Sequence, residues 1–292
     1  MSKKISFLVF NFGKKRLRNL WHTMEVVRQI QQDNMYANIE FVCIEHGDEE
    51  YSKEKAEECG FRYEYYFDPL LLSHRSTLRN KAVEHAEHDW VILHDNDILP
   101  DPKFFDDIMD MIETTDVDYF SNFKEVYDLT EQLTGILVAD LQTQNKFIFG
   151  YINGTDRTHT HNFDACAIRP HGFWTFTEAT GGSFTIKKDT FLANPFDEEY
   201  QQWGAEDNAF KLHQVAAIGW EKFGMLNKVL LHSYHDTPVN YDPSTGIIQI
   251  HTEDLNKNRD MLYSSIDSLS GGMNTDSFEL VETTLCVTAT NR

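Results

Sequence analysis

The chain has 292 residues, of which 41% are hydrophobic and 25% are charged. These proportions are close to those of globular proteins, so we expect one folded unit and not a disordered chain. The 26 basic and 47 acidic residues give a formal net charge of −21. This charge argues against passive binding to DNA, RNA or anionic membranes, because such binding depends mainly on Lys and Arg.

The cysteines and the apolar runs bear on the compartment. Cys43, Cys59, Cys166 and Cys286 are scattered and form no CxxC pair, so we expect them to be reduced. The apolar run near the start is too short for a signal peptide or a membrane span, and no other run approaches about 20 residues. We therefore expect a cytoplasmic protein without a signal peptide or transmembrane segment.

The first 120 residues alternate between apolar strands and amphipathic helices. The expected strands are Ile5–Phe10, Ile39–Glu45, Arg62–Phe67 and Trp90–Leu93, and the expected helices are about Arg16–Gln32, Tyr51–Cys59, Ser76–Glu87 and Lys103–Glu113. This alternation predicts the α/β class, with a Rossmann-like, mostly parallel twisted sheet flanked by helices.

The second part of the chain is less regular. The expected elements are strands at Asp118–Asn122, Lys146–Tyr151, Phe184–Lys187, Val229–His232 and near Leu280–Thr288, and helices at Lys188–Ala193, Glu206–Ile218 and around Asp254–Leu269. No repeat or linker divides the chain, so we expect a single domain over residues 1–292.

The segment Val91–Asp97 (VILHDND) delivers two carboxylates to the end of an expected buried strand. Ligands of open α/β sheets collect at this edge. Residues i and i+2 of an extended segment point the same way, so Asp95 and Asp97 are expected to converge and to repel each other unless a cation neutralises them. A hard divalent ion is the natural partner. The alternative is a polar turn without a ligand, because Asp and Asn are common in turns.

Glu206 and Asp207 stand at the start of an expected helix, after Trp203-Gly204-Ala205. One interpretation is that they only cap the helix, since its N-terminal dipole favours negative charge. In the functional interpretation one acid is a general base and the other accepts hydrogen bonds from sugar hydroxyls. Trp203 then supplies an apolar face for a sugar ring, or else belongs to the core.

His232 and His235 follow an expected strand and are close enough in sequence to reach one site from a turn. Imidazole suits Mn²⁺ and other transition metals, although a lone histidine of this kind is usually structural. A second group is either an acceptor platform or incidental, and its spacing matches no usual zinc pattern. Its members are His159, His161, His171, Phe173 and Trp174.

Four segments stand in an order and spacing that closely resemble the β-1,4-galactosyltransferase-type catalytic domain, which has a GT-A fold. They also resemble chondroitin-polymerase-like transferase modules. The segments are DWVILHDNDILP, GGSFTIKKDTFLANPF, YQQWGAEDNAF and LLHSYHD. The similarity extends from Ile5 to about Val287 and is weakest over residues 120–178. It implies a nucleotide-binding half over about 1–120 and an acceptor and catalytic half over about 121–292.

The resemblance implies roles for individual residues. Asp97, His235 and His232 are implied to ligate Mn²⁺ or Mg²⁺, and His232 stands where the animal enzymes have a methionine. Asp207 is implied to be the catalytic base, with Glu206 beside it holding sugar hydroxyls. The implied contacts with the donor sugar, its nucleotide or its diphosphate are Asn11, Arg16, Arg79, Asn80, Asp95, Gly181 and Gly182.

These residues predict a metal-dependent inverting glycosyltransferase. It would transfer a sugar from a UDP-sugar, with a galactose- or N-acetylgalactosamine-like sugar favoured, to a hydroxyl of a glycan acceptor. The segment Asp236–Gly246, rich in Pro, Gly, Asn and Asp, is expected to close over the donor. Two alternatives stay open: a phage-type hexosyl- or pentosyltransferase acting on a hydroxymethylated DNA base, against which the net charge argues, and a non-catalytic metal- or sugar-binding module.

Overall fold

The computed structural model describes residues 3–14, 16–33, 36–68, 75–129, 131–132, 134–135, 169–173, 181–200, 205–235, 240–242, 247–249, 257–258 and 260–264. The helices are α1 Leu17–Asp33, α2 Lys53–Glu58, α3 Arg75–His85, α4 Phe104–Thr114, α7 Lys188–Ala193, α8 Glu206–Ile218 and the short 3-10 helix Trp220–Lys222. The strands are β1 Ile5–Phe12, β2 Ile39–Gly47, β3 Arg62–Phe67, β4 Trp90–Asp95, β5 Ile98–Leu99, β6 Tyr119–Ser121, β7 Glu125–Asp128, β8 Arg169–Phe173, β9 Ser183–Lys187, β10 Phe223–Met225, β11 Val229–His232, β12 Asn240–Asp242 and β13 Ile247–Gln249.

The main sheet has the strand order β10-β6-β9-β4-β1-β2-β3. β4, β1, β2 and β3 are parallel to one another, and β10 is parallel to β6. β9 lies between β4 and β6 and runs antiparallel to both. The predicted mostly parallel sheet is therefore confirmed, and its carboxyl edge beside β1 and β4 carries the polar residues described below.

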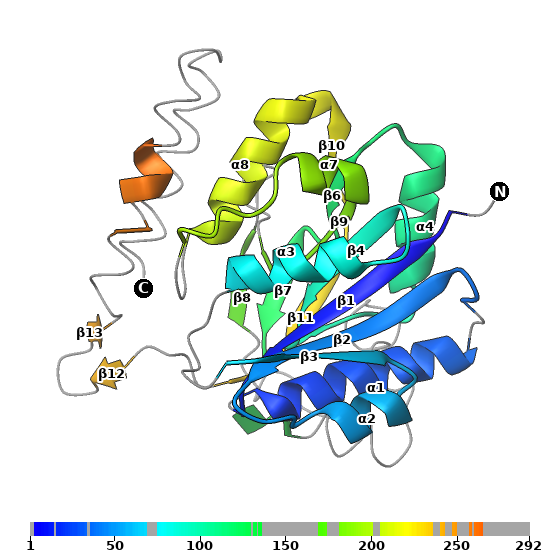
Figure 1. Cartoon of the computed structure of the whole chain (residues 1–292), viewed down its shortest axis with the longest axis vertical. Coiled ribbons are helices and arrows are strands. Elements are labelled where there is room, and N and C mark those ends of the chain that lie inside the picture. The colour runs from blue at the N-terminus through cyan, green and yellow to red at the C-terminus, as the bar shows by residue number, and fades with distance from the viewer. Residues whose placement is uncertain are drawn as a thin grey trace.

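Hydrophobic cores cover both faces of this sheet. Successive side chains of a strand point to opposite faces, so Phe7 and Val9 of β1 pack with residues of α1 and α4, while Leu8 and Phe10 pack with residues of α3 and α8. Figure 1 shows α1 and α2 on one side of the sheet and α3, α7 and α8 on the other. A strand buried on both faces needs a continuous apolar run, which is what β1 and β4 have.

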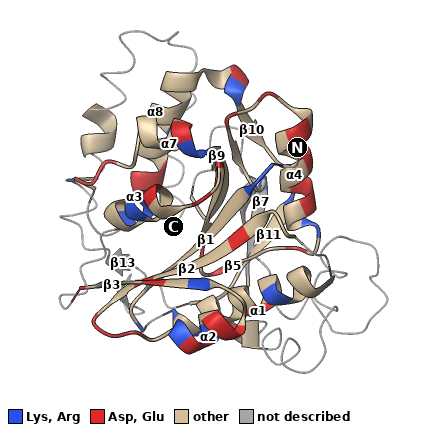
Figure 2. Ribbon diagram, turned by 45° about the vertical axis from the view of Figure 1, so that its right-hand side comes forward, with Lys and Arg blue, Asp and Glu red and all other residues tan. Residues whose placement is uncertain are grey.

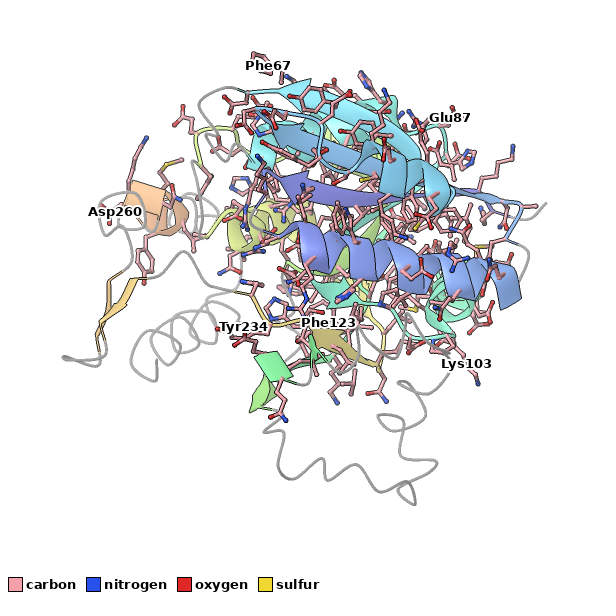
Figure 3. All side chains as sticks on the ribbon, turned by 90° about the horizontal axis from the view of Figure 1, so that it is seen from below. Phe67, Glu87, Lys103, Phe123, Tyr234 and Asp260 are labelled. Atoms are coloured by element: carbon pink, nitrogen blue, oxygen red, sulfur yellow. The ribbon has the colours of Figure 1, made fainter. Side chains whose placement is uncertain are left out.

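A second sheet has the order β5-β11-β7-β8. β11 is antiparallel to β5 and parallel to β7. In Figure 3 Phe123, two residues before β7, and Tyr234, two residues after β11, lie on the opposite side of the molecule from Phe67, the last residue of the edge strand β3. The second sheet thus begins directly after β4 and lies away from the β3 edge of the main sheet.

The strands and helices predicted for the first 120 residues are all present, with ends within a few residues of those expected. The predicted strands β6, β9 and β11 are also present, whereas the short strands β5, β7, β8, β10, β12 and β13 were not predicted individually. Within the expected helix around Asp254–Leu269, residues 257–258 and 260–264 are helical. The expected strands Lys146–Tyr151 and Leu280–Thr288 lie outside the described residues.

Among the described residues, most Asp and Glu side chains are exposed or partly exposed. Figure 2 shows Asp and Glu along α4, where Asp106, Asp110 and Glu113 are exposed. Cys43 and Cys59 are buried and free, as expected, whereas Cys166 and Cys286 lie outside the described residues. Within the described residues, no helix has both the length and the apolar character needed to cross a membrane.

Candidate active site

The acidic turn after β4 lies at the junction of the two sheets. Asp97 is the last residue of the turn and leads into β5, which pairs antiparallel with β11 so that His232 lies opposite Ile98. The backbone N–H of Ser233 donates to the carbonyl oxygen of Asp97 at 2.7 Å. This pairing joins the acidic turn to a histidine-bearing segment far along the chain.

Asp97, His232 and His235 form a compact group of metal-ligand type. The Asp97 Oδ2 atom lies 3.2 Å from Nε2 of His235 and 3.5 Å from Nε2 of His232, and the two Nε2 atoms are 3.2 Å apart. One donor atom from each residue lies within 4.8 Å of the others. Two imidazole nitrogens and a carboxylate oxygen suit Mn²⁺ and other divalent transition metals.

The carboxylate of Asp97 is held in its charged form. Its side chain is only 2% exposed, and Nη1 of Arg16 lies 2.5 Å from its Oδ2 atom. Although burial opposes ionisation, His232 and Arg16 lower the pKa of Asp97 well below its ordinary value. An ionised carboxylate is the form that binds a cation, so the electrostatics of the turn agree with its geometry.

Asp95 and Asp97 have different partners within the protein, and their convergence on one cation stays a prediction. Asp95 ends β4, but residues 96–97 form a turn, so the alternation of an extended strand no longer applies. Oδ1 of Asp95 instead accepts a hydrogen bond from Nη2 of Arg79 at 3.1 Å. Among the described residues, the group that could hold a metal consists of Asp97 and the two histidines, without Asp95.

Arg79 of α3 is the centre of a second, acidic group. Its guanidinium is buried and donates from Nη1 to Oδ1 of Asp207 at 2.7 Å, while Oε1 of Glu206 lies 4.0 Å from the same nitrogen. It also lies 5.0 Å from the ring centre of Phe196. Despite the burial, Asp207, Asp95 and Glu206 raise the pKa of Arg79, so this side chain stays charged. Arg79 therefore connects Asp95 on β4 with the acidic pair on α8.

The carboxyl group of Asp207 has a pKa that its surroundings raise toward neutral pH. Burial is the largest effect on its carboxyl, and the nearby carboxylates of Glu206 and Asp95 add to it. Together they raise the pKa of Asp207 to about 7, although Arg79 opposes the shift. The side chain keeps 22% of its surface exposed. A general base works best when its pKa lies near the working pH, so Asp207 has the property expected of one.

Three residues near Asp207 have a backbone conformation with positive φ. Gly181 has φ of +73°, and a Cβ atom added to it would lie 2.6 Å from Oδ2 of Asp207. Ala205, directly before α8, has φ of +68°, which is uncommon for a residue with a side chain. Gly182 has φ of +68°, and its carbonyl oxygen accepts a hydrogen bond from the backbone N–H of Asp95 at 2.7 Å. The two glycines thus lie between the acidic turn and the acid on α8.

Asn11 and Asn80 lie at the same edge, but their side chains are bonded within the protein. Nδ2 of Asn11 donates to Oε1 of Glu45 at 2.7 Å, and its Oδ1 accepts from Nδ2 of Asn96 at 3.1 Å. Nδ2 of Asn80 donates to the carbonyl of Phe196 at 2.9 Å, and its Oδ1 accepts from the N–H of the same residue at 2.9 Å. These bonds support the turn and the Arg79 region, and direct donor contact by either amide stays a prediction.

Three residues at the site were not singled out from the sequence. Thr23 of α1 donates from Oγ1 to the carbonyls of Asn96 and Ile98. Nη1 of Arg75 lies 3.8 Å from Oε1 of Glu206, and His94 is buried directly before the acidic turn. For Arg75 a signal existed, because a residue four positions before Arg79 lies on the same face of α3. For Thr23 and His94 the local sequence holds no such signal.

Several predicted features lie wholly or partly outside the described residues. Trp203 lies outside the described residues, as do His159, His161 and Trp174. His171 and Phe173 belong to β8, which pairs with β7. Of the expected lid, residues 240–242 form β12, which pairs with β13, and the other residues lie outside the described part.

Solved structures of similar architecture show which class the fold defines. Glucosyl-3-phosphoglycerate synthase from Mycobacterium tuberculosis, in complex with Mn²⁺, uridine diphosphate and phosphoglyceric acid, superposes with a TM-score of 0.53 at 12% identity, covering 94% of this chain and 80% of that chain. Its complex with Mg²⁺ and uridine diphosphate gives 0.50 at 10% identity, covering 94% and 81%. At such identities the likeness shows the fold alone, which is the GT-A type.

The sequence comparisons then identify the family. The model of glycosyl transferase family 2 matches residues 11–169, which is more than half of the chain. The protein belongs to this family and is a glycosyltransferase. Chondroitin synthase from Escherichia coli is 27% identical over 152 residues, covering 46% of this chain and 21% of that protein. The chain thus aligns with about a fifth of this relative's length.

Proposed function

We propose that the protein is a metal-dependent, inverting glycosyltransferase that moves a sugar from a UDP-sugar to a hydroxyl group of a glycan acceptor. A galactose- or N-acetylgalactosamine-like donor is favoured by the resemblance of its motifs. The observation that carries the proposal is the pairing of two groups at one sheet edge. One is the Asp97–His232–His235 group, and the other is Asp207 with a pKa of about 7.

The first group supports a role in holding the diphosphate. Asp97, His232 and His235 would hold Mn²⁺ or Mg²⁺, since the donor atoms are already close together. A divalent ion bound there would neutralise charge that develops on the departing diphosphate. Arg16, now within 2.5 Å of Asp97, would supply further positive charge for the phosphates. The solved complexes of glucosyl-3-phosphoglycerate synthase contain Mn²⁺ or Mg²⁺ together with uridine diphosphate, which agrees with this assignment.

The second group supports a role in activating the acceptor. Asp207 would take the proton from the acceptor hydroxyl while the hydroxyl oxygen attacks the anomeric carbon of the donor. The bond from that carbon to the phosphate oxygen breaks as the new bond forms, and the electron pair leaves with the diphosphate. A single displacement of this kind inverts the anomeric configuration and needs no nucleophile from the protein.

The remaining residues would position the reactants. Arg79 holds Asp207 on one side and Asp95 on the other, so it would keep the base aligned with the donor site. Glu206 would accept hydrogen bonds from sugar hydroxyls. Gly181 and Gly182 would line the donor sugar, because backbone without side chains allows a close approach.

A transfer assay tests the proposal directly. UDP-galactose, UDP-N-acetylgalactosamine and UDP-glucose are each incubated with the protein, Mn²⁺ and a panel of glycan acceptors, and released UDP is measured. We expect release from at least one donor that depends on the acceptor and is lost with EDTA, and a product whose anomeric proton shows inversion by NMR. Failure to release UDP from any donor would contradict the proposal. Activity only with hydroxymethylated DNA would show that the acceptor is a DNA base and not a glycan.

A further inference from the structure

His94 is a buried histidine that neither group of the site contains. It is the fifth residue of β4, directly before the acidic turn, and only 1% of it is exposed. Its Nδ1 atom lies 2.8 Å from Oγ of Ser183, and its Nε2 atom lies 2.9 Å from the carbonyl oxygen of Ile98. The ring therefore spans from β9 on one side to β5 on the other.

The partners of His94 determine which nitrogen carries the proton. The carbonyl oxygen of Ile98 can only accept, so Nε2 must be the N–H donor. Burial lowers the pKa of His94 to about 4, so the ring is neutral near pH 7 and Nδ1 is an acceptor. Nδ1 then accepts a hydrogen bond from the hydroxyl group of Ser183.

Two further hydrogen bonds lead to Ser183 and point in the same donor-to-acceptor direction. The Oγ atom of Ser183 accepts a hydrogen bond from Nδ2 of Asn122 at 2.8 Å, and Oδ1 of Asn122 accepts one from Oγ1 of Thr185 at 2.6 Å. All four side chains are buried. The result is a one-way chain of hydrogen bonds from Thr185 to Ile98, and each donor in it has one acceptor. Such a chain holds its members in one arrangement, because reversing any bond leaves a buried polar group without a partner.

Each end of the imidazole reaches one half of the proposed active site. Ile98, bonded to Nε2, lies opposite His232 in the β5–β11 pair. Ser183, bonded to Nδ1, directly follows the two glycines, and Gly181 lies against Oδ2 of Asp207. His94 itself is joined through the backbone to Asp95. One rigid ring therefore touches the strand that faces a proposed metal ligand and the segment that contacts the proposed base.

We propose that His94, as the neutral Nε2-protonated tautomer, is a positioning residue that sets the Asp97–His232–His235 group and Asp207 in register with each other. The proposal rests on the proposed function. In this proposal the hydrogen bond from Nε2 to Ile98 positions the Asp97–His232–His235 group. The hydrogen bond that Nδ1 accepts from Ser183 positions the segment against Asp207. A planar ring with polar atoms at both ends suits this task, since its two nitrogens are a fixed distance apart.

Two substitutions separate the two ends of the ring. In His94→Asn the amide oxygen takes the place of Nδ1 and can still accept from Ser183, but the donor to Ile98 is lost. In His94→Gln the amide nitrogen takes the place of Nε2 and can still donate to Ile98, but the acceptor for Ser183 is lost. His94→Leu removes both ends. His22→Gln, at another buried histidine, is the control for general loss of stability.

The measurements are the Mn²⁺ dissociation constant from electron paramagnetic resonance of free Mn²⁺, kcat with saturating Mn²⁺, and Tm. Substituting residues that orient metal ligands typically weakens metal binding or activity about 10- to 100-fold. We expect a loss of this size in Mn²⁺ affinity for His94→Asn. For His94→Gln we expect it in kcat, with Mn²⁺ affinity within about threefold of wild type. His22→Gln should lower Tm alone.

The outcomes are separable. If the His94 variants lower Tm but keep Mn²⁺ affinity and kcat, His94 is only a core residue and the proposal is overturned. Equal losses of Mn²⁺ affinity and kcat in His94→Asn and His94→Gln would overturn the assignment of the two ends. Should His94→Leu fail to fold, the two amide variants still decide. If the wild-type protein itself neither binds Mn²⁺ nor transfers sugar, the proposed function fails instead.

Discussion

Asp207 combines partial exposure, a raised pKa and a buried arginine partner. The three properties serve different ends. In the proposed mechanism, the exposure would admit an acceptor hydroxyl, the raised pKa would let the carboxyl take a proton near pH 7, and Arg79 would hold the carboxylate in place. In Asp207→Asn the shape of the side chain is kept but the proton acceptor is lost.

We therefore expect Asp207→Asn to lower kcat by about 10²- to 10⁴-fold, the usual contribution of a general base. Donor binding should change little, because the proposed metal and diphosphate site lies with Asp97. Kinetics and calorimetric titration of the donor measure the two effects. Asp189→Asn, at an exposed acid on α7, is the matched control and should behave as wild type. Loss of donor binding in Asp207→Asn would instead assign Asp207 to the donor site.

The pH dependence of activity follows from the same carboxyl. The base acts only when deprotonated, so kcat/KM should rise with pH until about 7 and then level off. Glu206 raises the pKa of Asp207, and Glu206→Gln removes that negative charge. The rising limb should therefore move to lower pH in Glu206→Gln. A limb that stays in place or moves to higher pH would show that another group controls it.

At the scale of elements, the connection before β9 brings two glycines with positive φ against the site. Gly181 needs both its backbone conformation and its lack of a side chain, since a Cβ atom would lie 2.6 Å from Asp207. Gly60, after α2, has φ of +80°, and its nearest contact for an added Cβ is 3.7 Å away. Both glycines have a positive φ, but only at Gly181 would an added Cβ atom clash with a neighbouring side chain.

Gly181→Ala and Gly60→Ala should each lower the free energy of unfolding by about 1–2 kcal/mol, because a residue with a Cβ is strained in the left-handed region. Only Gly181→Ala should also reduce kcat, since it displaces the carboxylate of Asp207. Denaturant unfolding and steady-state kinetics together test this. Unchanged kcat in Gly181→Ala would show that Asp207 can move aside without loss of function.

Elements with a clear local pattern were predicted correctly, among them the short strands β6, β9 and β11, whereas β5, β7, β8, β10, β12 and β13 were not. β1 and β4 are apolar along their length because both faces are covered, so they stand out in the sequence. β5 has two residues and exists because β11 pairs with it. Nothing in the residues near Ile98 indicates that partner, since the two strands are far apart in the chain.

At the scale of the whole molecule, ligand binding should stabilise the fold. A ligand that binds only the folded protein adds about 2.7 kcal/mol when present at 100 times its dissociation constant. We expect a UDP-sugar donor with Mn²⁺ to raise Tm by several degrees, and EDTA to abolish most of this shift. Differential scanning fluorimetry over a panel of nucleotide sugars would also identify the preferred donor.

Asp97→Ala should remove the Mn²⁺-dependent part of that shift, because Asp97 is the carboxylate of the proposed metal group. Asp110→Ala, at an exposed acid on α4, should leave it intact. The comparison uses the shift and not Tm itself, since removing a buried carboxylate changes the stability of the unliganded protein as well. An undiminished shift in Asp97→Ala would contradict the metal assignment.

The sequence by itself determined the alternation of strands and helices, the position of the acidic turn at a strand end, and the acids at the start of α8. These features depend on neighbours in the chain, so periodicity and local motifs reveal them. It also indicated the family, because four motifs occur in a characteristic order. The convergence of Asp95 and Asp97 on one cation stays a prediction, because the chain turns at residues 96–97 and the two carboxylates have different partners in the protein.

Only the tertiary structure decided which partner each carboxylate has. Pairing of β5 with β11 brings His232 to Asp97, and Arg79 of α3 contacts both Asp95 of β4 and Asp207 of α8. The pKa of Asp207 likewise depends on burial and on charges from other elements. Such contacts join residues that are distant in the chain, and the strength of each depends on distance and burial, which arise only when the chain is folded.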